Sequence, residues 1–193
     1  MNHYSFFAMI TRMKYINRWG LMNNTRQENL SEHSLEVAVI AHSLAVIHNV
    51  RFGGNVNTER AALLGIYHDS SEIITGDLPT PIKYYNPDIQ TAYKSIEAAA
   101  QERLVKLLPE DLAPIYANIL TPANEDTELL KFIKAADKLS ALIKCIEELR
   151  MGNKEFSKAE NSTRKALEAM SLPEVNVFMQ ELLPAFELTL DDL

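Results

Sequence analysis

Four side chains of the types that bind metals occur in three separate segments of this sequence. Two are histidines and two are aspartates, each within or beside residues with helical apolar spacing: His33, His68, Asp69 and Asp137. Burying two imidazoles and two carboxylates in a helical core is costly unless something pairs them. Because one divalent cation pairs all four, the set predicts a metal site with room for water and a phosphate oxygen. The ligand types suit Mn, Fe, Co, Zn or Ni and do not choose among these metals.

Asp137 is the strongest single indication of such a site. It interrupts an otherwise apolar row with spacings of three and four residues, which contains Leu130, Ile133 and Ala141. An unpaired carboxylate in that row would be expensive to bury. The alternative is that Asp137 pairs with Lys134 or Lys138, and that His33 bonds to a backbone carbonyl.

Glu72 is a candidate general acid or base. It follows Asp69 by three residues and His68 by four, so on one continuous helix it faces the same side. A carboxylate one turn from a metal site can transfer protons to or from a substrate. The alternative is a surface residue that forms an ion pair with a lysine.

Two stretches without helical periodicity offer substrate-binding groups. Tyr15–Leu30 is expected to be a long irregular loop, and such loops are often functional. Within it, Arg18 suits bidentate phosphate binding, and Trp19 offers a flat wall for a base or sugar. The alternative is a solvated arginine beside a core tryptophan. A second loop, stiffened by two prolines, offers Asp77 and Thr80 to a sugar hydroxyl or phosphate, although an aspartate beside glycine is more often only a turn residue.

The elements that must position these residues are all helical. Apolar residues recur at intervals of three and four rather than two, so the sequence predicts an all-α fold without a sheet. The expected helices cover about 6–13, 31–50, 57–75, 89–107, 125–150, 154–170 and 173–183, with a short one after 109–111. The metal-ligand pair and Glu72 therefore fall within one predicted helix.

The composition limits the possible functions. The chain has 193 residues, of which 47% are hydrophobic, which suits one domain with a sizeable core. Its net charge of −7 argues against binding a nucleic-acid polymer. Cys145 is the only cysteine, so no internal disulfide is possible and a packing role is expected. We find no uninterrupted apolar run of transmembrane length and no signal peptide, and so expect no membrane association.

The chain resembles a known superfamily. His33, His68-Asp69 and Asp137 resemble the H…HD…D pattern of the HD-domain metal-dependent phosphohydrolases. Further segments resemble the bacterial 5'-deoxynucleotidases of that superfamily: Ile16–Trp19, Glu28–Leu35, Gly53–Asn57, Tyr67–Glu72 and Gly76–Pro81. The resemblance implies a single-domain, HD-type helical bundle over residues 1–193. Its metal-site core would cover about 28–140 and its C-terminal helices about 154–185.

The resemblance also implies an activity. Proteins of this family hydrolyse deoxyribonucleoside 5'-monophosphates to deoxynucleoside and phosphate, and are cytoplasmic homodimers with one divalent metal. By matching position, the metal ligands would be His33, His68, Asp69 and Asp137. Arg18 would orient the phosphate, Glu72 would be the catalytic acid or base, and Trp19 would exclude ribonucleotides by crowding the 2' position. Our mechanistic hypothesis adds that Asp69 helps to orient the attacking water. The residues implied to contact substrate are Arg18, Trp19, His33, Asp69, Asp77, Leu78, Pro79 and Thr80.

Three alternatives remain. The first is another HD-type nucleotide phosphohydrolase or phosphodiesterase, although a triphosphate substrate would call for more cations near the metal than Arg18, with Arg26 or Lys83, supplies. A non-catalytic, nucleotide-binding HD module would be favoured by a missing ligand or a missing Glu72, and neither is missing. A purely structural helical scaffold is disfavoured by Asp137.

Overall fold

The computed structural model describes residues 4–83 and 85–192, without the side chains of Thr80 and Asn124. Among these residues it contains helices and no strand, which confirms the all-α prediction. The α-helices are α1 (Phe6–Ile10), α2 (Leu30–Phe52), α3 (Thr58–Tyr67), α4 (Glu72–Thr75), α5 (Thr80–Lys83), α6 (Pro87–Val105), α7 (Ala113–Leu120), α8 (Thr127–Arg150), α9 (Ser157–Ala169) and α10 (Pro173–Val177). Short 3-10 or π turns lie at η1 (Thr11–Tyr15), η2 (Asn124–Asp126), η3 (Lys154–Phe156), η4 (Phe178–Leu182), η5 (Leu183–Glu187) and η6 (Leu190–Asp192).

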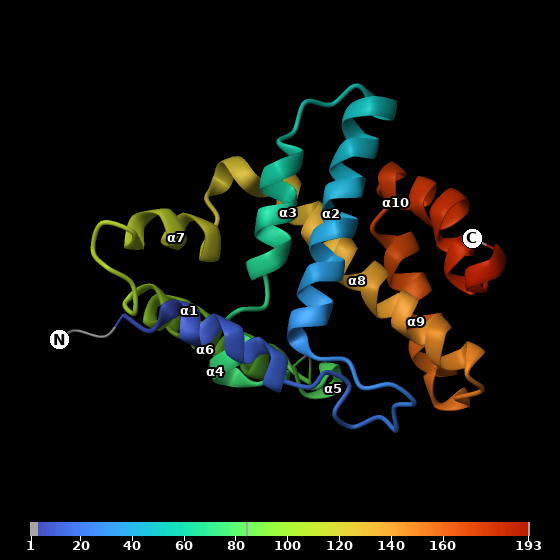
Figure 1. Ribbon diagram of the computed structural model, residues 1–193, viewed down its shortest axis with the longest axis horizontal. Coiled ribbons are helices and arrows are strands. Elements are labelled where there is room, and N and C mark those ends of the chain that lie inside the picture. The colour runs from blue at the N-terminus through green and yellow to red at the C-terminus, as the bar shows by residue number, and fades with distance from the viewer. Residues whose placement is uncertain (1–3, 84, 193) are drawn as a thin grey trace.

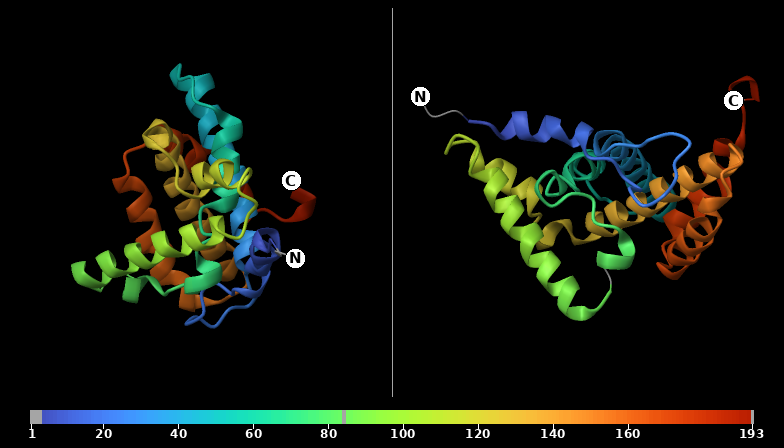
Figure 2. Two further views of the ribbon diagram at one scale, coloured as in Figure 1. Left: turned by 90° about the vertical axis from the view of Figure 1, so that its left-hand side faces the viewer. Right: turned by 90° about the horizontal axis from the view of Figure 1, so that it is seen from below.

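Three helices form the centre of the fold. Helix α2 lies beside α3, and α8 crosses both of them (Figure 1). Their shared core includes Val37, Leu44, Leu64, Phe132 and Leu139, each at most 2% exposed. Helices α9 and α10 pack on one side of this centre, while α1, α6 and α7 lie on the other (Figure 2). The site residues come from this central trio and from the loops that leave it.

Helix α2 begins with a well-formed cap. The Asn29 side chain accepts hydrogen bonds from the backbone N–H groups of Ser31 and Glu32, and the Glu32 side chain accepts the N–H of Asn29. Such caps stabilise a helix start by about 0.5–2 kcal/mol. This start places His33 in the first turn with its side chain fully buried.

Helix α2 is apolar around most of its circumference. Its most apolar 18-residue window has a mean hydropathy of 1.3, so by length and composition this helix could cross a membrane. The helix is not an uninterrupted apolar run, as expected from the sequence, because charged or polar residues such as Glu36, His42 and Arg51 lie within it. In the fold, one side of α2 packs on α3 and α8, as a core helix does.

The prediction of one helix through residue 75 is wrong. Helix α3 ends at Tyr67, and the chain turns before α4 begins at Glu72. Tight backbone bonds from Ser70 N–H to the Tyr67 carbonyl and from Glu72 N–H to the Asp69 carbonyl hold this turn. Apolar periodicity does not reveal this turn, because the apolar residues on both sides of it still fit one continuous helix.

The approach of α3 to α2 depends on a glycine. A Cβ on Gly65 would lie 2.6 Å from the Ala38 Cα, which is closer than packed atoms allow. The two helices therefore meet backbone to backbone just before the turn that carries His68. This close approach sets the position of His68 along the length of α2.

Other expectations need smaller corrections. The expected first helix, for which the spacing places Phe6, Phe7, Ile10 and Met13 on one face, is α1 followed by a 3-10 turn. Phe6 and Met13 are buried, whereas Phe7 is exposed. The last expected helix is α10 continued by the π turn η4. The irregular loop is confirmed: only the isolated bridge between Asn17 and Asn29 interrupts it between η1 and α2. The predicted domain limits remain a prediction.

Candidate metal centre and nucleotide site

The structure brings the four predicted metal ligands together. His33 comes from the first turn of α2, His68 and Asp69 from the turn after α3, and Asp137 from the middle of α8. One ligand-type atom from each lies within 4.8 Å of those of the other three. His33 Nε2 is 3.2 Å from Asp137 Oδ1, and His68 Nε2 is 2.9 Å from Asp69 Oδ2. Because the turn replaces a straight helix, His68 and Asp69 converge rather than diverge by about 100°.

The far nitrogen of each imidazole is held by the protein. His68 Nδ1 donates to the Gly65 carbonyl at 2.8 Å, and His33 Nδ1 donates to Ser140 Oγ at 2.9 Å. The Ser140 hydroxyl in turn donates to Glu36 at 2.5 Å. Outer partners of this kind fix the tautomer and orientation of a metal-binding histidine. They leave both Nε2 lone pairs facing the aspartates.

Those Nε2 atoms are the buried groups that a cation would satisfy. Neither the Nε2 of His33 nor that of His68 forms a well-shaped hydrogen bond within the described part of the chain. Two neutral imidazoles and two carboxylates make an N2O2 donor set with a net charge near zero around a divalent ion. The donor set thus fits a divalent metal and does not specify which one.

The electrostatics of the cluster agree with that use. Burial by itself lowers the pKa of His33, but its contacts with Asp137, Asp69 and Glu28 outweigh burial and raise it to about 10. Burial likewise works to raise the pKa of Asp137, but the contact with His33 leaves it lower than usual. Without a cation, a proton on His33 therefore supplies the positive charge that the nearby carboxylates need. Metal binding would displace that proton.

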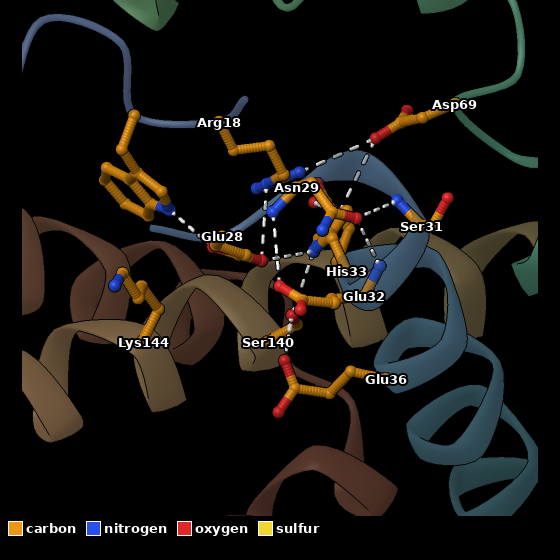
Figure 3. Close-up of polar contacts among 12 residues, drawn as sticks. Arg18, Glu28, Asn29, Ser31, Glu32, His33, Glu36, Asp69, Ser140 and Lys144 are labelled. Atoms are coloured by element: carbon orange, nitrogen blue, oxygen red, sulfur yellow. Dashed lines mark hydrogen bonds and ion pairs between the residues drawn. The ribbon is translucent and has the colours of Figure 1, made fainter. Parts of the chain in front are cut away.

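Arg18, for which the sequence predicts phosphate binding, lies at the edge of the cluster. Its Nη1 is 3.7 Å from Asp69 Oδ2, and its Nε is 3.5 Å from Glu28 Oε1 (Figure 3). The guanidinium is only 11% exposed, so its charge is weakly screened. It can hold an anionic group that also reaches the metal centre.

Trp19 adopts a backbone conformation that is unusual for its type. Its φ is +58°, in the left-handed region that residues other than glycine seldom occupy. Its indole Nε1 donates to Glu28 Oε2 at 2.9 Å, and its ring packs against Phe156 with centroids 5.3 Å apart. Such strain persists where surrounding contacts enforce it, commonly at functional sites.

Glu72 is buried rather than on the surface. It is 4% exposed at the start of α4, and its Oε2 has no hydrogen-bond partner in the described structure. Lys83 Nζ lies 3.8 Å from its other oxygen, so the expected lysine is present, but as a partly buried neighbour. Burial, followed by repulsion from Asp69 and Asp77, raises the pKa of Glu72 to about 9. At neutral pH this carboxyl holds a proton that it can donate.

The proline-containing loop lies near the same cluster. Asp77, Leu78 and Pro79 are half-buried, and burial raises the pKa of Asp77 while nearby Arg18 opposes that shift. The side chain of Thr80 lies outside the described part of the structure. Substrate contacts for these four residues remain a prediction.

Three supporting residues were not predicted: Glu28, Glu36 and Ser140. Ser140 follows Asp137 by three residues in α8, so helical spacing could have found it. Glu36 bears the same spacing to His33 on α2. Glu28 lies in the irregular loop, where no periodicity relates it to its partners.

The fold and the cluster together define a class. A helical domain whose H…HD…D residues converge in the core is an HD-domain phosphohydrolase architecture. The chain superposes with a TM-score of 0.82 on an HD-domain phosphohydrolase from Listeria innocua, with 23% identity, covering 96% of this chain and 90% of that one. It also matches the cyanophage S-2L HD phosphohydrolase DatZ, bound to dA and one catalytic Zn2+ ion, with a TM-score of 0.67 and 19% identity over 94% of this chain and 97% of that one.

Sequence comparison gives the particular family. The family model described as 5'-deoxynucleotidase YfbR-like matches residues 5–186. The 5'-deoxynucleotidase YfbR of Escherichia coli O1:K1 is 50% identical over all of this chain and 97% of its own length, and a 5'-deoxynucleotidase of Enterobacter sp. (strain 638) matches equally well. The chain belongs to the YfbR-like 5'-deoxynucleotidase family, which confirms the resemblance seen in the sequence.

Proposed function

We propose that this protein hydrolyses deoxyribonucleoside 5'-monophosphates to deoxynucleoside and inorganic phosphate, using one divalent cation. The observation that carries the proposal is the convergence of His33, His68, Asp69 and Asp137 beside a buried arginine and a proton-bearing glutamate. Half-identical relatives over the full chain are named for this activity.

The four converging residues would hold the cation. When bound, a divalent metal polarises a phosphoryl oxygen and lowers the pKa of a water molecule. Arg18 binds the phosphate oxygens and offsets the charge that gathers on them in the transition state. Asp69, which faces both Arg18 and the histidines, orients the attacking water.

Glu72 is assigned as the proton donor. As the bond between phosphorus and the 5' oxygen breaks, the Glu72 carboxyl gives its proton to that oxygen. An alkyl oxide leaves slowly without such help. The burial that keeps Glu72 protonated at neutral pH supports this role.

Sugar selectivity is assigned to Trp19, with Asp77 to Thr80 lining the nucleoside. The indole is held from two sides, by Glu28 and by Phe156, so it cannot easily move aside for a 2'-hydroxyl. A rigid indole rejects ribonucleotides because their 2'-hydroxyl clashes with it, and not because they lack a favourable contact.

The reaction class is tested by product analysis on metal-stripped protein with Mn, Co, Zn or Mg restored. We expect deoxyadenosine and phosphate from dAMP, and little release from dATP or cyclic AMP. Faster release of pyrophosphate or triphosphate from dATP, or ring opening of cyclic AMP, would assign the site to one of the other HD hydrolases. Nucleotide binding without any turnover would support the non-catalytic module.

We also propose that the protein is a homodimer that pairs through α2. The outward side of α2 carries apolar residues at coiled-coil-like intervals: Leu35, Val39, Val46 and Val50, which are 36–77% exposed. Antiparallel pairing of two copies about His42 would cover this stripe and bring Glu32 of each copy toward Arg51 of the other. Sedimentation should show a dimer that Val39→Lys dissociates, whereas Ile115→Lys, on the exposed side of α7, leaves it intact.

A cytoplasmic location and the absence of a nucleic-acid or membrane partner complete the proposal. The acidic net charge and the single buried cysteine support it. Cell fractionation tests this location directly.

A further inference from the structure

We propose that Glu28 is a positioning residue that joins the metal centre to the phosphate-binding and sugar-selecting residues. This inference rests on the proposed function, because it assigns Glu28 a role in the same reaction. The Glu28 carboxylate faces Nδ1 of His33, whereas Asp69 and Asp137 face the other ring nitrogen, Nε2. It acts instead through Arg18, Trp19 and His33.

One carboxylate contacts all three of those residues. Oε2 accepts the Trp19 indole N–H at 2.9 Å, while Oε1 lies 3.5 Å from Arg18 Nε and 3.4 Å from His33 Nδ1 (Figure 3). The Glu28 side chain is only 12% exposed. Charged contacts in such surroundings are weakly screened and therefore hold geometry well.

The backbone brings Glu28 to this place. The Arg18 N–H donates to the Glu28 carbonyl at 2.9 Å, and the Leu30 N–H donates to the Ile16 carbonyl at 2.9 Å. These bonds close the loop so that its last residues lie opposite its first ones. Glu28 therefore faces Arg18 and Trp19 from across the loop, and His33 from one turn before it.

The contact between Glu28 and Trp19 matters because the Trp19 backbone is strained. A tryptophan with φ of +58° would relax to an ordinary backbone conformation if its side chain were free. The bond to Glu28 holds the indole where it is, while the same carboxylate holds the guanidinium beside Asp69. Loss of Glu28 should loosen the sugar wall and the phosphate-binding group together.

Trp19 is the only tryptophan, so its fluorescence reports this contact in the metal-free protein. Glu28→Ala should shift the emission maximum and increase quenching by acrylamide, with an unchanged helical circular dichroism spectrum. Glu28→Gln keeps an oxygen for the indole N–H but removes the charge, so it should preserve the fluorescence. The matched control is Glu147→Gln, a carboxylate that lines the same cavity of about 170 Å³ beside Glu28.

Kinetics separates positioning from a general loss of folded protein. Glu28→Ala should raise the ratio of kcat/KM for AMP to that for dAMP by about tenfold or more, because a loosened Trp19 excludes the 2'-hydroxyl less well. Glu28→Gln should raise the KM for dAMP about 10- to 100-fold, as expected for outer partners of a site, while leaving that ratio unchanged. A partly unfolded enzyme would lower both kcat values equally and leave both KM values alone.

Unchanged Trp19 fluorescence in Glu28→Ala, or an unchanged AMP to dAMP ratio in a variant that still turns over, would overturn the proposal. If even the unaltered protein hydrolyses no dAMP, the proposed function fails. The fluorescence of the metal-free variants then still decides whether Glu28 holds Trp19.

Discussion

His33 Nε2 and Asp137 Oδ1 lie 3.2 Å apart, although one residue begins α2 and the other lies midway along α8. Asp69 Oδ2 approaches the same nitrogen to 3.6 Å from a third element. Two carboxylates meeting at one imidazole repel each other unless positive charge lies between them. The packing of α2, α3 and α8 therefore builds a cation site as part of the core.

Removing one carboxylate should weaken that site sharply. Metal at about 100 times its Kd stabilises a protein by about 2.7 kcal/mol, which for this chain length raises Tm by about 5–10 °C. Asp137→Asn should lose most of this metal-induced rise, as measured by differential scanning calorimetry with Mn or Co added. Asp111→Asn, on an exposed surface, is the control and should keep the full rise. An equal rise in both variants would mean that the metal binds elsewhere.

Replacing the proton donor should affect turnover alone. Glu72→Gln cannot donate a carboxyl proton, so kcat should fall by about 10²–10⁴-fold while metal and substrate still bind. Isothermal titration of the variant with dAMP and metal checks the binding. Turnover close to that of the original protein would remove Glu72 from the mechanism.

The same proton gives the pH dependence. The buried Glu72 carboxyl has its pKa raised to about 9, so the donating form predominates at neutral pH and disappears as pH rises. A nearby divalent cation favours the carboxylate, so the alkaline fall in kcat should lie below pH 9. A kcat that keeps rising to pH 10 would contradict this assignment.

The tryptophan wall predicts a change in sugar selectivity. Trp19→Ala removes the ring that crowds the 2' position, so hydrolysis of AMP should rise relative to dAMP. Trp19→Phe keeps a flat ring against Phe156 and should stay selective. If Trp19→Ala remains as selective as the original protein, the discrimination resides in another residue.

The loop that carries Arg18 and Trp19 is anchored from behind by a buried ion pair. Glu148 is 0% exposed; it contacts Lys144 Nζ at 2.5 Å and accepts the Thr25 N–H at 2.9 Å. Burial works against its charge, but these bonds hold the pKa of Glu148 well below its usual 4.5. Stability from this group is thus complete above about pH 4.5 and is lost as pH falls toward the lowered pKa.

Breaking that pair should cost about 3–5 kcal/mol, since it leaves Lys144 buried without its partner. Urea unfolding of Glu148→Gln should show this deficit at pH 7 and a smaller one below pH 4. Glu168→Gln, which is solvent-exposed, should unfold like the original protein at both values. A deficit that is equally large at both pH values would show that the effect does not depend on charge.

Much of the site was predictable because metal-binding side chains such as carboxylates and imidazoles are expensive to bury without a partner. Asp137 stands out in the sequence since a carboxylate in an apolar row needs a partner, and the structure provides one in His33. The turn at His68 was not predictable from spacing, because apolar positions on both sides of it still fit a helix. Apolar periodicity indicates which side of a helix is buried, but it does not indicate where the backbone leaves the helix for a turn.

The supporting residues show a second limit. Glu28 meets Arg18, Trp19 and His33 only because the loop doubles back on itself through the Arg18–Glu28 backbone bond. Nothing in the types of these residues specifies that pairing. Long-range contacts in irregular segments depend on the completed fold, whereas helical contacts follow from spacing.

The central claim is that one metal centre, held by the four converging residues, removes phosphate from deoxynucleotides and not from ribonucleotides. Its most direct test is phosphate release from dAMP and AMP in parallel, on metal-stripped protein with Mn, Co, Zn or Mg added back. We predict release from dAMP that requires added metal, with little release from AMP. Equal release from both nucleotides, or release that persists without metal, would contradict the claim.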